Sequence, residues 1–351
     1  MVLPPVIVVM ASCILDRLVG DPRWCLHPVQ VMGAVVGQLR LWVEALCGDR
    51  PWALRLGGGL ITALLVSGST AAGWALEQLS LQTPWSFPLL VIALASALAG
   101  RSLRLAVEDV LKPLSSSPPD LELARQKLAW IVGRDVEGLP APELLRATAE
   151  TASENAVDGL FAPLFWMLIG AGLWHLNPAW PGPLALAWAF KASSTLDSML
   201  GYRRGRLQWL GTAGARLDDA LTWLPCRLLA LSLGQLGPAL RDGASDPSPN
   251  AGVSQAAYAH ALGLQLGGVA GDHRERGERQ RKLWDGCRLF GVALVDLPAL
   301  EPRDVVHQHA AELADDGVGA DLLDELHGRR AQLRVVDAVA HRLFRVKPIE
   351  M

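Results

Sequence analysis

The sequence predicts an all-α protein: a polytopic integral membrane helical bundle with cytoplasmic helical loops and a C-terminal helical tail. Of its 351 residues, 51% are hydrophobic and 19% are charged, whereas soluble proteins carry about 25% charged residues. Long stretches lack Lys, Arg, Asp and Glu altogether. Tryptophans lie near the ends of these stretches, where aromatic belts form at membrane interfaces. We expect about five or more membrane segments.

The uncharged stretches locate the membrane segments, because a spanning helix needs roughly 20 apolar residues. Residues 56–76 and 78–100 each suit one helix, and residues 159–190 suit a helical hairpin with its turn at 175–181. Residues 1–15 lack the basic start and the convincing cleavage site of a signal peptide. They are interpreted as a retained first membrane segment.

Residues 221–240 form a less regular apolar stretch, which Pro225 and Arg227 interrupt. It is interpreted as a re-entrant or interfacial helix. The alternative to a membrane protein is a large soluble protein with buried helices. Tryptophans near the predicted span ends argue against that alternative: Trp52, Trp74, Trp85, Trp166, Trp174 and Trp180.

Lys and Arg in the connections predict the orientation, because cytoplasmic loops are enriched in both. The connections at 101–156 and 201–216 are rich in basic residues and are expected in the cytoplasm. The loops at 77–85 and 175–181 contain none. The N-terminus, uncharged before Asp16, is therefore expected outside.

Two regions outside the apolar stretches are predicted to be soluble. Helices are expected at residues 120–132 and 141–154, inside the basic connection. The charged residues 301–351 carry apolar positions at roughly helical spacing. The chain is therefore divided into a membrane-embedded domain, residues 1–300, and a C-terminal soluble helical extension, residues 301–351, whose role the sequence does not reveal.

The composition excludes several functions. A net charge of −3 argues against a nucleic-acid binder, which needs a basic surface to neutralise phosphates. The five cysteines show neither metal-ligand spacing nor a disulfide pattern, so reduced thiols are expected. No Walker A loop, Gly-x-Gly-x-x-Gly fingerprint or Gly-x-Ser-x-Gly elbow occurs.

Four polar clusters border the apolar segments: residues 16–28, 150–158, 191–219 and 246–252. Ionisable residues at a membrane boundary are energetically unfavourable, so they indicate function. Carboxylates, hydroxyls and amides are the oxygen ligands that Mg²⁺ prefers, and Arg and Lys bind phosphates. The combination suits nucleotide-dependent group transfer. Taken singly, Glu154 with Asp158 also fits a solvated helix face, and Arg203–Arg206 fits a positive-inside anchor.

The blocks LDRLVGDPRWCLHPV, SENAVDGLFAPLFW, KASSTLDSMLGYRRGR, ARLDDALTWLPCRLL and SPNAGVSQAAYAHALGLQLGG resemble the CobD/CbiB family in wording and order. The resemblance covers about residues 12–300, so this domain is expected to be the catalytic one. It implies a multi-pass inner-membrane enzyme of cobalamin biosynthesis, an adenosylcobinamide-phosphate synthase. Such an ATP-dependent acid–amine C–N ligase attaches (R)-1-aminopropan-2-ol, or its O-phosphate, to the f propionate of adenosylcobyric acid.

The resemblance also implies ATP and Mg²⁺ as cofactors. The implied partners are the corrinoid substrate, aminopropanol or its phosphate, the lipid bilayer and other enzymes of the cobalamin pathway. Ser194, Thr222 and Pro247 depart from the residues usual in the family, so no catalytic role is assigned to them.

Site residues are placed on this chemistry as a hypothesis. The predicted catalytic residues are Glu154, Asp158, Lys191 and Asp197, with Glu154 or Asp158 as general base. The predicted metal ligands are Asp197, Asp218 and Asp219. Because adjacent residues diverge around a helix, at most one of Asp218 and Asp219 is expected to bind directly. The predicted substrate- and phosphate-binding residues are Asn155, Arg203, Arg216, Asn250, Asp16, Asp21 and His27.

Two other functions compete with the ligase. One is a non-enzymatic membrane regulator, because the same superfamily includes proteins that resemble the signalling protein AmpE. The other is a component of a corrinoid transporter, which would place charges near the bilayer midplane. The many charges at the predicted cytoplasmic ends favour an enzyme. The sequence leaves open the amine substrate, the mode of ATP binding, the oligomeric state and the exact number of spans.

Overall fold

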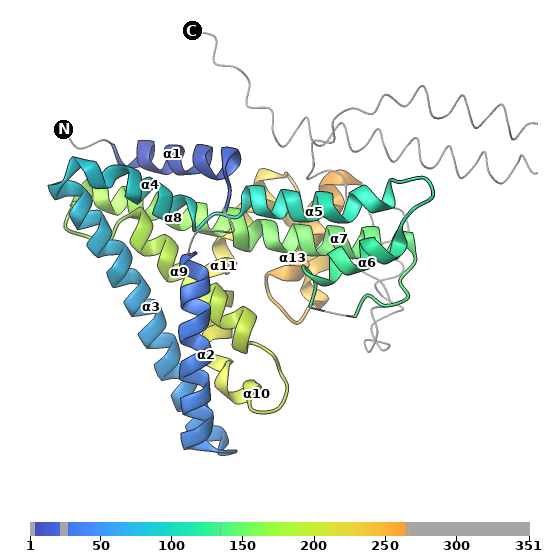
Figure 1. Cartoon of the computed structure of the whole chain (residues 1–351), viewed down its shortest axis with the longest axis horizontal. Helices are drawn as coiled ribbons and strands as arrows, with labels where there is room; N and C mark the ends of the chain where they lie inside the picture. The colour runs from blue at the N-terminus through green and yellow to red at the C-terminus, as the bar shows by residue number, and fades with distance from the viewer. Residues whose placement is uncertain (1–3, 22–26, 134, 264–265, 267–351) are drawn as a thin grey trace, which may run out of the picture. The chain divides into compact units, whose positions relative to one another are not determined.

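The computed structural model describes residues 4–21, 27–133, 135–263 and 266, and Figure 1 shows its helices. Within these residues no β-strand occurs, which confirms the all-α prediction. The predicted extension at residues 301–351 lies outside them. The chain divides into two compact units. The first contains Met1–Leu103 and Ser153–Ala257, and the second contains Arg104–Ala152 with the end of the last described helix.

The first unit begins with three helices, each started by a proline in its first turn: α1 (Pro5–Leu18), α2 (Pro28–Cys47) and α3 (Pro51–Gln82). Proline suits this position because the first helical N–H groups have no partner within the helix. With 14 residues, α1 is about 21 Å long, shorter than the roughly 30 Å hydrocarbon layer. The outside N-terminus therefore stays a prediction.

Helix α3 contains the predicted span at 56–76 but continues past its expected end. The loop predicted at 77–85 begins only at Thr83. Glu77, the charged residue expected to end the span, lies inside the helix and is fully buried. Its carboxylate accepts the backbone N–H groups of Gly182 (2.8 Å), Leu184 (2.6 Å) and Ala185 (3.1 Å). A charge that marks a segment boundary in the sequence is therefore a buried contact between two segments.

The stretch predicted as one helix at 78–100 is divided. A 3-10 turn, η1 (Pro84–Ser86), follows α3, and α4 (Phe87–Ala95) covers the apolar core of the stretch. Residues 96–99 are not helical, and α5 (Gly100–Leu114) begins directly after them.

The predicted hairpin at 159–190 is confirmed by α8 (Ala162–Leu176) and α9 (Pro183–Leu200). The indole N–H groups of Trp174 and Trp74 fix its turn by donating to the carbonyls of Pro178 and Ala179, each at 2.9 Å. Glycine allows the close approach: a Cβ on Gly170 would lie 2.3 Å from the carbonyl oxygen of Gly182. Small residues at such crossings are typical of membrane helices.

Four short or irregular elements surround the long α11 (Thr212–Ser232): α10 (Leu207–Leu210), α12 (Leu236–Asp242), η3 (Gly243–Ser245) and α13 (Ala251–Leu262). Helix α11 runs unbroken through Pro225 and ends at Ser232, inside the irregular apolar stretch at 221–240. Proline lacks an N–H, so it leaves the carbonyl of Leu221 without its helical partner. The indole N–H of Trp166 donates to that carbonyl at 3.2 Å.

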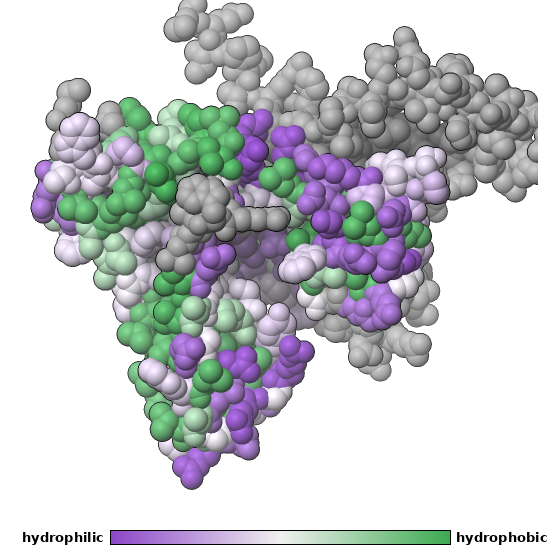
Figure 2. Space-filling view, viewed as in Figure 1, coloured by the Kyte–Doolittle hydropathy of each residue, from purple (hydrophilic) through white to green (hydrophobic). Residues whose placement is uncertain are grey.

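The first unit buries an apolar core and exposes apolar helix faces. Leu54, Ile61, Leu196 and Leu210 pack where α3, α9 and α10 meet. In contrast, Leu56, Leu60 and Leu64 of α3 are 58–64% exposed, and Figure 2 shows apolar residues spread over α1, α3 and α4. Within the part of the chain that the structure describes, three helical stretches are long and apolar enough to cross a membrane: Pro51–Gln82, Phe87–Leu114 and Ala141–Leu176. The chain is therefore a membrane protein.

The second unit contains the two helices predicted inside the basic connection, observed as α6 (Leu121–Ala129) and α7 (Ala141–Ala156). Asp120 caps α6 by accepting the N–H of Leu123 at 2.9 Å. The apolar faces of α5, α6 and α7 form a separate core around Val110, Leu128 and Leu144. This connection therefore folds around a core of its own.

Candidate active site

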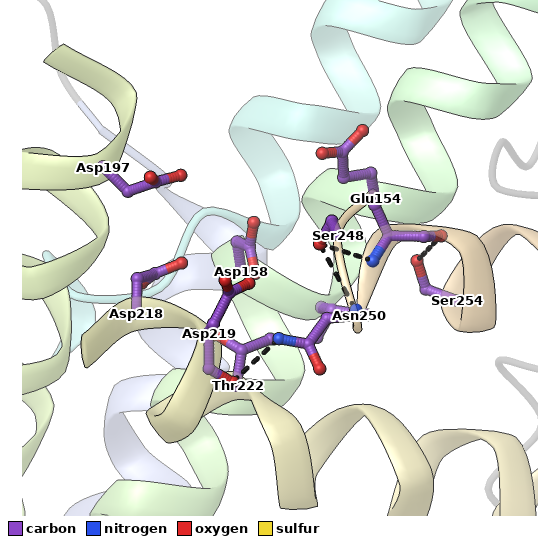
Figure 3. Close-up of a pocket in the computed structure, with 11 residues that line it drawn as sticks. Glu154, Asp158, Asp197, Asp218, Asp219, Thr222, Ser248, Asn250 and Ser254 are labelled. Carbon is purple, nitrogen blue, oxygen red and sulfur yellow. Dashed lines mark hydrogen bonds between the residues drawn. The ribbon is translucent and has the colours of Figure 1, made fainter. Parts of the chain in front are cut away.

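A polar pocket in the first unit brings together residues from three of the four polar clusters (Figure 3). Five of its lining residues are acidic: Glu154, Asp158, Asp197, Asp218 and Asp219. The others are Val157, Thr222, Ser248, Asn250, Ala251 and Ser254. The sequence blocks that contain the predicted catalytic residues therefore meet in space.

A π-helical turn, η2 (Val157–Phe161), places Asp158 in this pocket between α7 and α8. Such a turn inserts one residue into a helix, and it is frequent at functional sites. The Lys191 ammonium donates to the carbonyl of Asp158 at 3.3 Å, and the N–H of Ala99 donates to the carbonyl of Gly159 at 2.7 Å. Lys191 is thereby held against the backbone beside the pocket.

Helix α9 contributes Asp197 from its last turn. The residue that follows the helix, Gly201, must be small: a Cβ there would lie 2.2 Å from Oδ1 of Asp197. The N–H of Gly201 also closes the helix by donating to the Asp197 carbonyl at 2.7 Å. The glycine of the sequence DSMLG therefore leaves room for the carboxylate.

Helix α11 contributes Asp218, Asp219 and Thr222. Asp218 and Thr222 are four residues apart and share one face of the helix. Both adjacent carboxylates line the pocket, Asp218 buried and Asp219 half-buried. Both therefore reach the pocket, and the expectation that at most one of them binds a metal directly stays a prediction.

Mutual repulsion makes the pocket favourable for a cation. Burial, followed by the charges of Asp158, Asp197 and Asp219, raises the pKa of Asp218 to about 8. Burial also raises the pKa of Asp219, which Arg203 opposes. Two buried oxygens of the lining, Oδ1 of Asp218 and Oγ1 of Thr222, have no hydrogen-bond partner. Hard oxygen donors of this kind fit Mg²⁺.

Among the described residues no group of three His, Cys, Asp or Glu side chains is close enough to form a metal cage. Mg²⁺ does not require one, because it is usually held by one or two carboxylates together with substrate phosphates and water. The pocket therefore fits a cation that arrives with a phosphate better than a resident structural metal.

A second polar network lies outside the pocket lining. Oδ1 of Asp21 is 3.1 Å from Nε2 of His27, and Oδ2 accepts the Ser102 hydroxyl at 2.8 Å. Nδ1 of His27 accepts the N–H of Val29 at 3.3 Å, so Nε2 carries the proton. Burial opposes ionisation of Asp21, but the bonds from His27 and Ser102 and the charge of Lys191 prevail and lower its pKa.

The other predicted site residues are more dispersed. Asp16 accepts the backbone N–H groups of Gly100 and Arg101, so it caps the start of α5. Asn250 lines the pocket, but its amide is engaged by Arg227 and by the Asp219 carbonyl. Asn155 and Arg216 are exposed and do not belong to the lining. Arg203 is also exposed and acts on Asp219 through its charge.

The sequence reasoning missed four residues with a place in or near the site. Thr222 and Ser254 line the pocket, as does Ser248, and Arg227 contacts its wall. The spacing of four residues between Asp218 and Thr222 on one helix was a usable signal for Thr222. For Ser248 the signal was its place in the polar cluster at residues 246–252. For Ser254 the sequence offers none, because it reaches the pocket only through the packing of α13.

Comparisons with known proteins place the sequence among relatives of one family. The family model of the CobD/Cbib protein matches residues 9–286. The cobalamin biosynthesis protein CobD of Synechocystis sp. is 40% identical over 302 residues, which cover 83% of this chain and 85% of that protein. The cobalamin biosynthesis protein CbiB of Salmonella typhi is 37% identical over 307 residues, 82% of this chain and 90% of that protein.

A third relative, the cobalamin biosynthesis protein CobD of Pelobacter propionicus, is 38% identical over 282 residues, which cover 76% of this chain and 82% of that protein. No solved structure matches the chain. The length of the family match and the identity to these relatives confirm the predicted resemblance: the chain belongs to the CobD/CbiB family.

Proposed function

We propose that the chain catalyses a step of cobalamin biosynthesis, the ATP-dependent joining of (R)-1-aminopropan-2-ol, or its O-phosphate, to the f propionate of adenosylcobyric acid. The observation that carries this proposal is the pocket, in which five carboxylates from three sequence blocks line one space beside Lys191. The relatives bear the name of cobalamin biosynthesis proteins, which supports the pathway.

The reaction needs an activated carboxyl group, because a carboxylate does not acylate an amine at a useful rate. In the proposed sequence a propionate oxygen attacks the γ-phosphorus of ATP and ADP leaves. The amine nitrogen then attacks the acyl carbon, phosphate leaves, and the amine proton passes to Glu154 or Asp158. Both side chains line the pocket, so either lies within reach of a bound substrate.

The carboxylates and the basic side chains have separate roles in binding the phosphate groups. When bound, Mg²⁺ supplies positive charge that neutralises phosphate oxygens. One or two of Asp197, Asp218 and Asp219 would hold it, together with phosphate oxygens and water. Lys191 is oriented by the Asp158 carbonyl, and Arg203 acts on Asp219 through its charge. These two side chains would therefore orient the phosphates against the carboxylates.

The size of the pocket limits what it holds. Its empty space is about 360 Å³, which includes space open to solvent. A corrin macrocycle is far larger than this space, even with the open part counted. We infer that only the propionate arm enters, while the ring stays outside.

The distribution of Arg supports a cytoplasmic site in the inner membrane. The N-terminal end of α3 lies with the segment after α9: Arg206 pairs with Asp49 at 2.6 Å, and Arg55 stacks on Trp209 at 4.4 Å. Arg203 and Arg204 belong to the same segment. In contrast, the turn at 177–182 contains no Lys, Arg or His, and His175 lies two residues before it. Positive charge at one end predicts that this end faces the cytoplasm.

The test is product formation by the purified, detergent-solubilised protein. Adenosylcobyric acid, ATP and Mg²⁺ are supplied with aminopropanol phosphate or aminopropanol, and corrinoids are followed by mass spectrometry. We expect an ATP-dependent amide. Glu154→Gln should reduce its formation strongly while the protein still inserts, whereas Glu44→Gln, in the α2 ion pair with Arg40, should not. No product with either amine would favour the regulator.

A further inference from the structure

One wall of the pocket is a short segment, residues 246–250, that joins η3 to α13. It supplies Ser248 and Asn250 to the lining. The segment is organised by its own contacts: Asp246 Oδ1 accepts the N–H of Ser248 at 2.9 Å, and Ser248 Oγ accepts the N–H groups of Asn250 (3.3 Å) and Ala251 (3.2 Å). It therefore behaves as one preformed unit.

Arg227 fastens this segment to α11. Its Nη1 donates to Oδ1 of Asn250 at 2.7 Å, and its Nη2 donates to the carbonyl of Pro249 at 2.8 Å. On its own helix, Nη1 also donates to the carbonyl of Trp223 at 3.0 Å. The guanidinium carbon lies 4.5 Å from the centroid of the Trp223 ring.

These contacts leave Arg227 poorly suited to bind a phosphate. Three of its five N–H groups donate to protein oxygens, and one face of the guanidinium is stacked on Trp223. The planar guanidinium donates to two oxygens of the same segment, which fixes both the distance and the angle between α11 and that segment. The role of Arg227 is therefore to hold the segment.

The attachment matters because α11 also carries the pocket carboxylates. Asp218, Asp219 and Thr222 lie roughly 1.5 to 2.5 turns before Arg227 on the same helix. Asn250 extends the connection, since its Nδ2 donates to the carbonyl of Asp219 at 2.9 Å. A single helix therefore carries two of the five pocket carboxylates and also anchors the segment that supplies Ser248 and Asn250 (Figure 3).

We propose that Arg227 is a positioning residue: it locks residues 246–250 onto α11, so that Ser248 and Asn250 are placed against the carboxylates before substrate binds. The effect on catalysis rests on the proposed function, whereas the attachment itself does not. Fixing a wall in advance lowers the conformational entropy lost on binding.

A native cysteine reports the attachment directly. Cys226 is fully buried, and its Sγ donates to the carbonyl of Asn250 at 3.3 Å. The reporter protein keeps Cys226 and replaces Cys13, Cys25, Cys47 and Cys287 by Ser. In this background we expect Arg227→Ala to raise the rate of N-ethylmaleimide labelling at least about tenfold. Arg227→Gln, a milder change, should give a smaller increase.

Two controls separate release of the segment from general loosening. Arg55→Ala removes a matched arginine, stacked on Trp209 at 4.4 Å, and should leave Cys226 labelling unchanged. A second reporter that keeps only Cys47 should label at the same rate with and without Arg227→Ala. If Cys226 is labelled no faster in either Arg227 variant, or if Cys47 accelerates equally, the proposal is wrong.

The catalytic part is tested by steady-state kinetics. Arg227→Gln should lower kcat for amide formation about tenfold, and Arg227→Lys should not restore it, because an ammonium lacks the planar fork. Wild-type kcat in both variants would overturn the positioning role. If the wild-type protein forms no amide while the labelling result holds, the proposed function fails and the attachment stands.

Discussion

The crossing of α3 and α9 and the pocket both bury acidic side chains, but they treat them in opposite ways. At the crossing, the two oxygens of Glu77 accept three backbone N–H groups. In the pocket, Asp218 faces three other carboxylates, and its Oδ1 has no hydrogen-bond partner. A structural carboxylate therefore differs from a functional one in the number of hydrogen-bond donors around it, and not in residue type.

The start of a helix explains this supply. The first N–H groups of α9 have no partner within the helix, and the helix dipole favours a negative charge there. Gly182 lets Glu77 approach, because a Cβ on it would lie 2.8 Å from the carboxylate. The pocket carboxylates instead extend from the sides of helices toward one another, so they need a ligand to supply the missing positive charge.

The largest effect is expected for Glu77→Gln. An amide keeps one acceptor and turns an NH₂ group toward backbone N–H donors, so buried N–H groups of α9 lose their partners. At 1–3 kcal/mol for each unsatisfied group, the free energy of unfolding should fall by about 3 kcal/mol. The thermal midpoint in detergent measures this.

Glu44→Gln is the control for Glu77, because it breaks a partly exposed ion pair with Arg40 on α2. It should change the free energy of unfolding by less than about 1 kcal/mol. Equal midpoints for both variants would show that the α9 start does not depend on Glu77.

The next effect, on activity, is expected for Asp218→Asn. The substitution removes a repelled charge, so the free energy of unfolding should stay equal or rise, as is common at functional sites. Amide formation should fall about 100-fold, a loss of roughly 2.7 kcal/mol in transition-state stabilisation. If the variant is destabilised and fully active, Asp218 is a structural carboxylate like Glu77, and the distinction between the two sites is wrong.

Part of this structure could be predicted from the sequence, namely the features that depend on local composition. The hairpin at 159–190 and the helices at 120–132 and 141–154 follow from local composition, and they are confirmed by α8, α9, α6 and α7. The grouping of the acidic blocks follows because costly charges at a membrane edge need a purpose. Asp158, Asp197 and Asp218 do line one pocket.

Long-range contacts could not be predicted. Glu77 was interpreted as the end of a span because its partners, from Gly182 onward, are more than 100 residues away. The capping role of Asp16 was hidden for the same reason, since Gly100 and Arg101 are distant in sequence. The π-turn at Asp158 and the hydrogen bonds of Arg227 to residues 249–250 depend on packing between helices, which no local sequence pattern encodes.

A smaller effect is expected for Asp16→Ala, which tests an intermediate case. Asp16 accepts the first N–H groups of α5, yet its Oδ1 has no partner. Loss of a cap should lower the free energy of unfolding by about 1 kcal/mol. Asp16→Asn should recover most of it, because Asn also caps helices well. Substrate KM should not change; a raised KM with unchanged stability would return Asp16 to the substrate-binding residues.

The smallest effect is expected for Trp166→Phe, which removes the donor to the Leu221 carbonyl. One such bond contributes about 1 kcal/mol, and the substitution also changes packing against Phe165. A double-mutant cycle with Pro225→Ala isolates the bond, because alanine restores the N–H that proline lacks. In that background the Leu221 carbonyl has its own helical partner, so Trp166→Phe should cost less by about 0.5–1 kcal/mol. No coupling would mean that water satisfies this carbonyl and that Trp166 contributes no net hydrogen-bond stabilisation here.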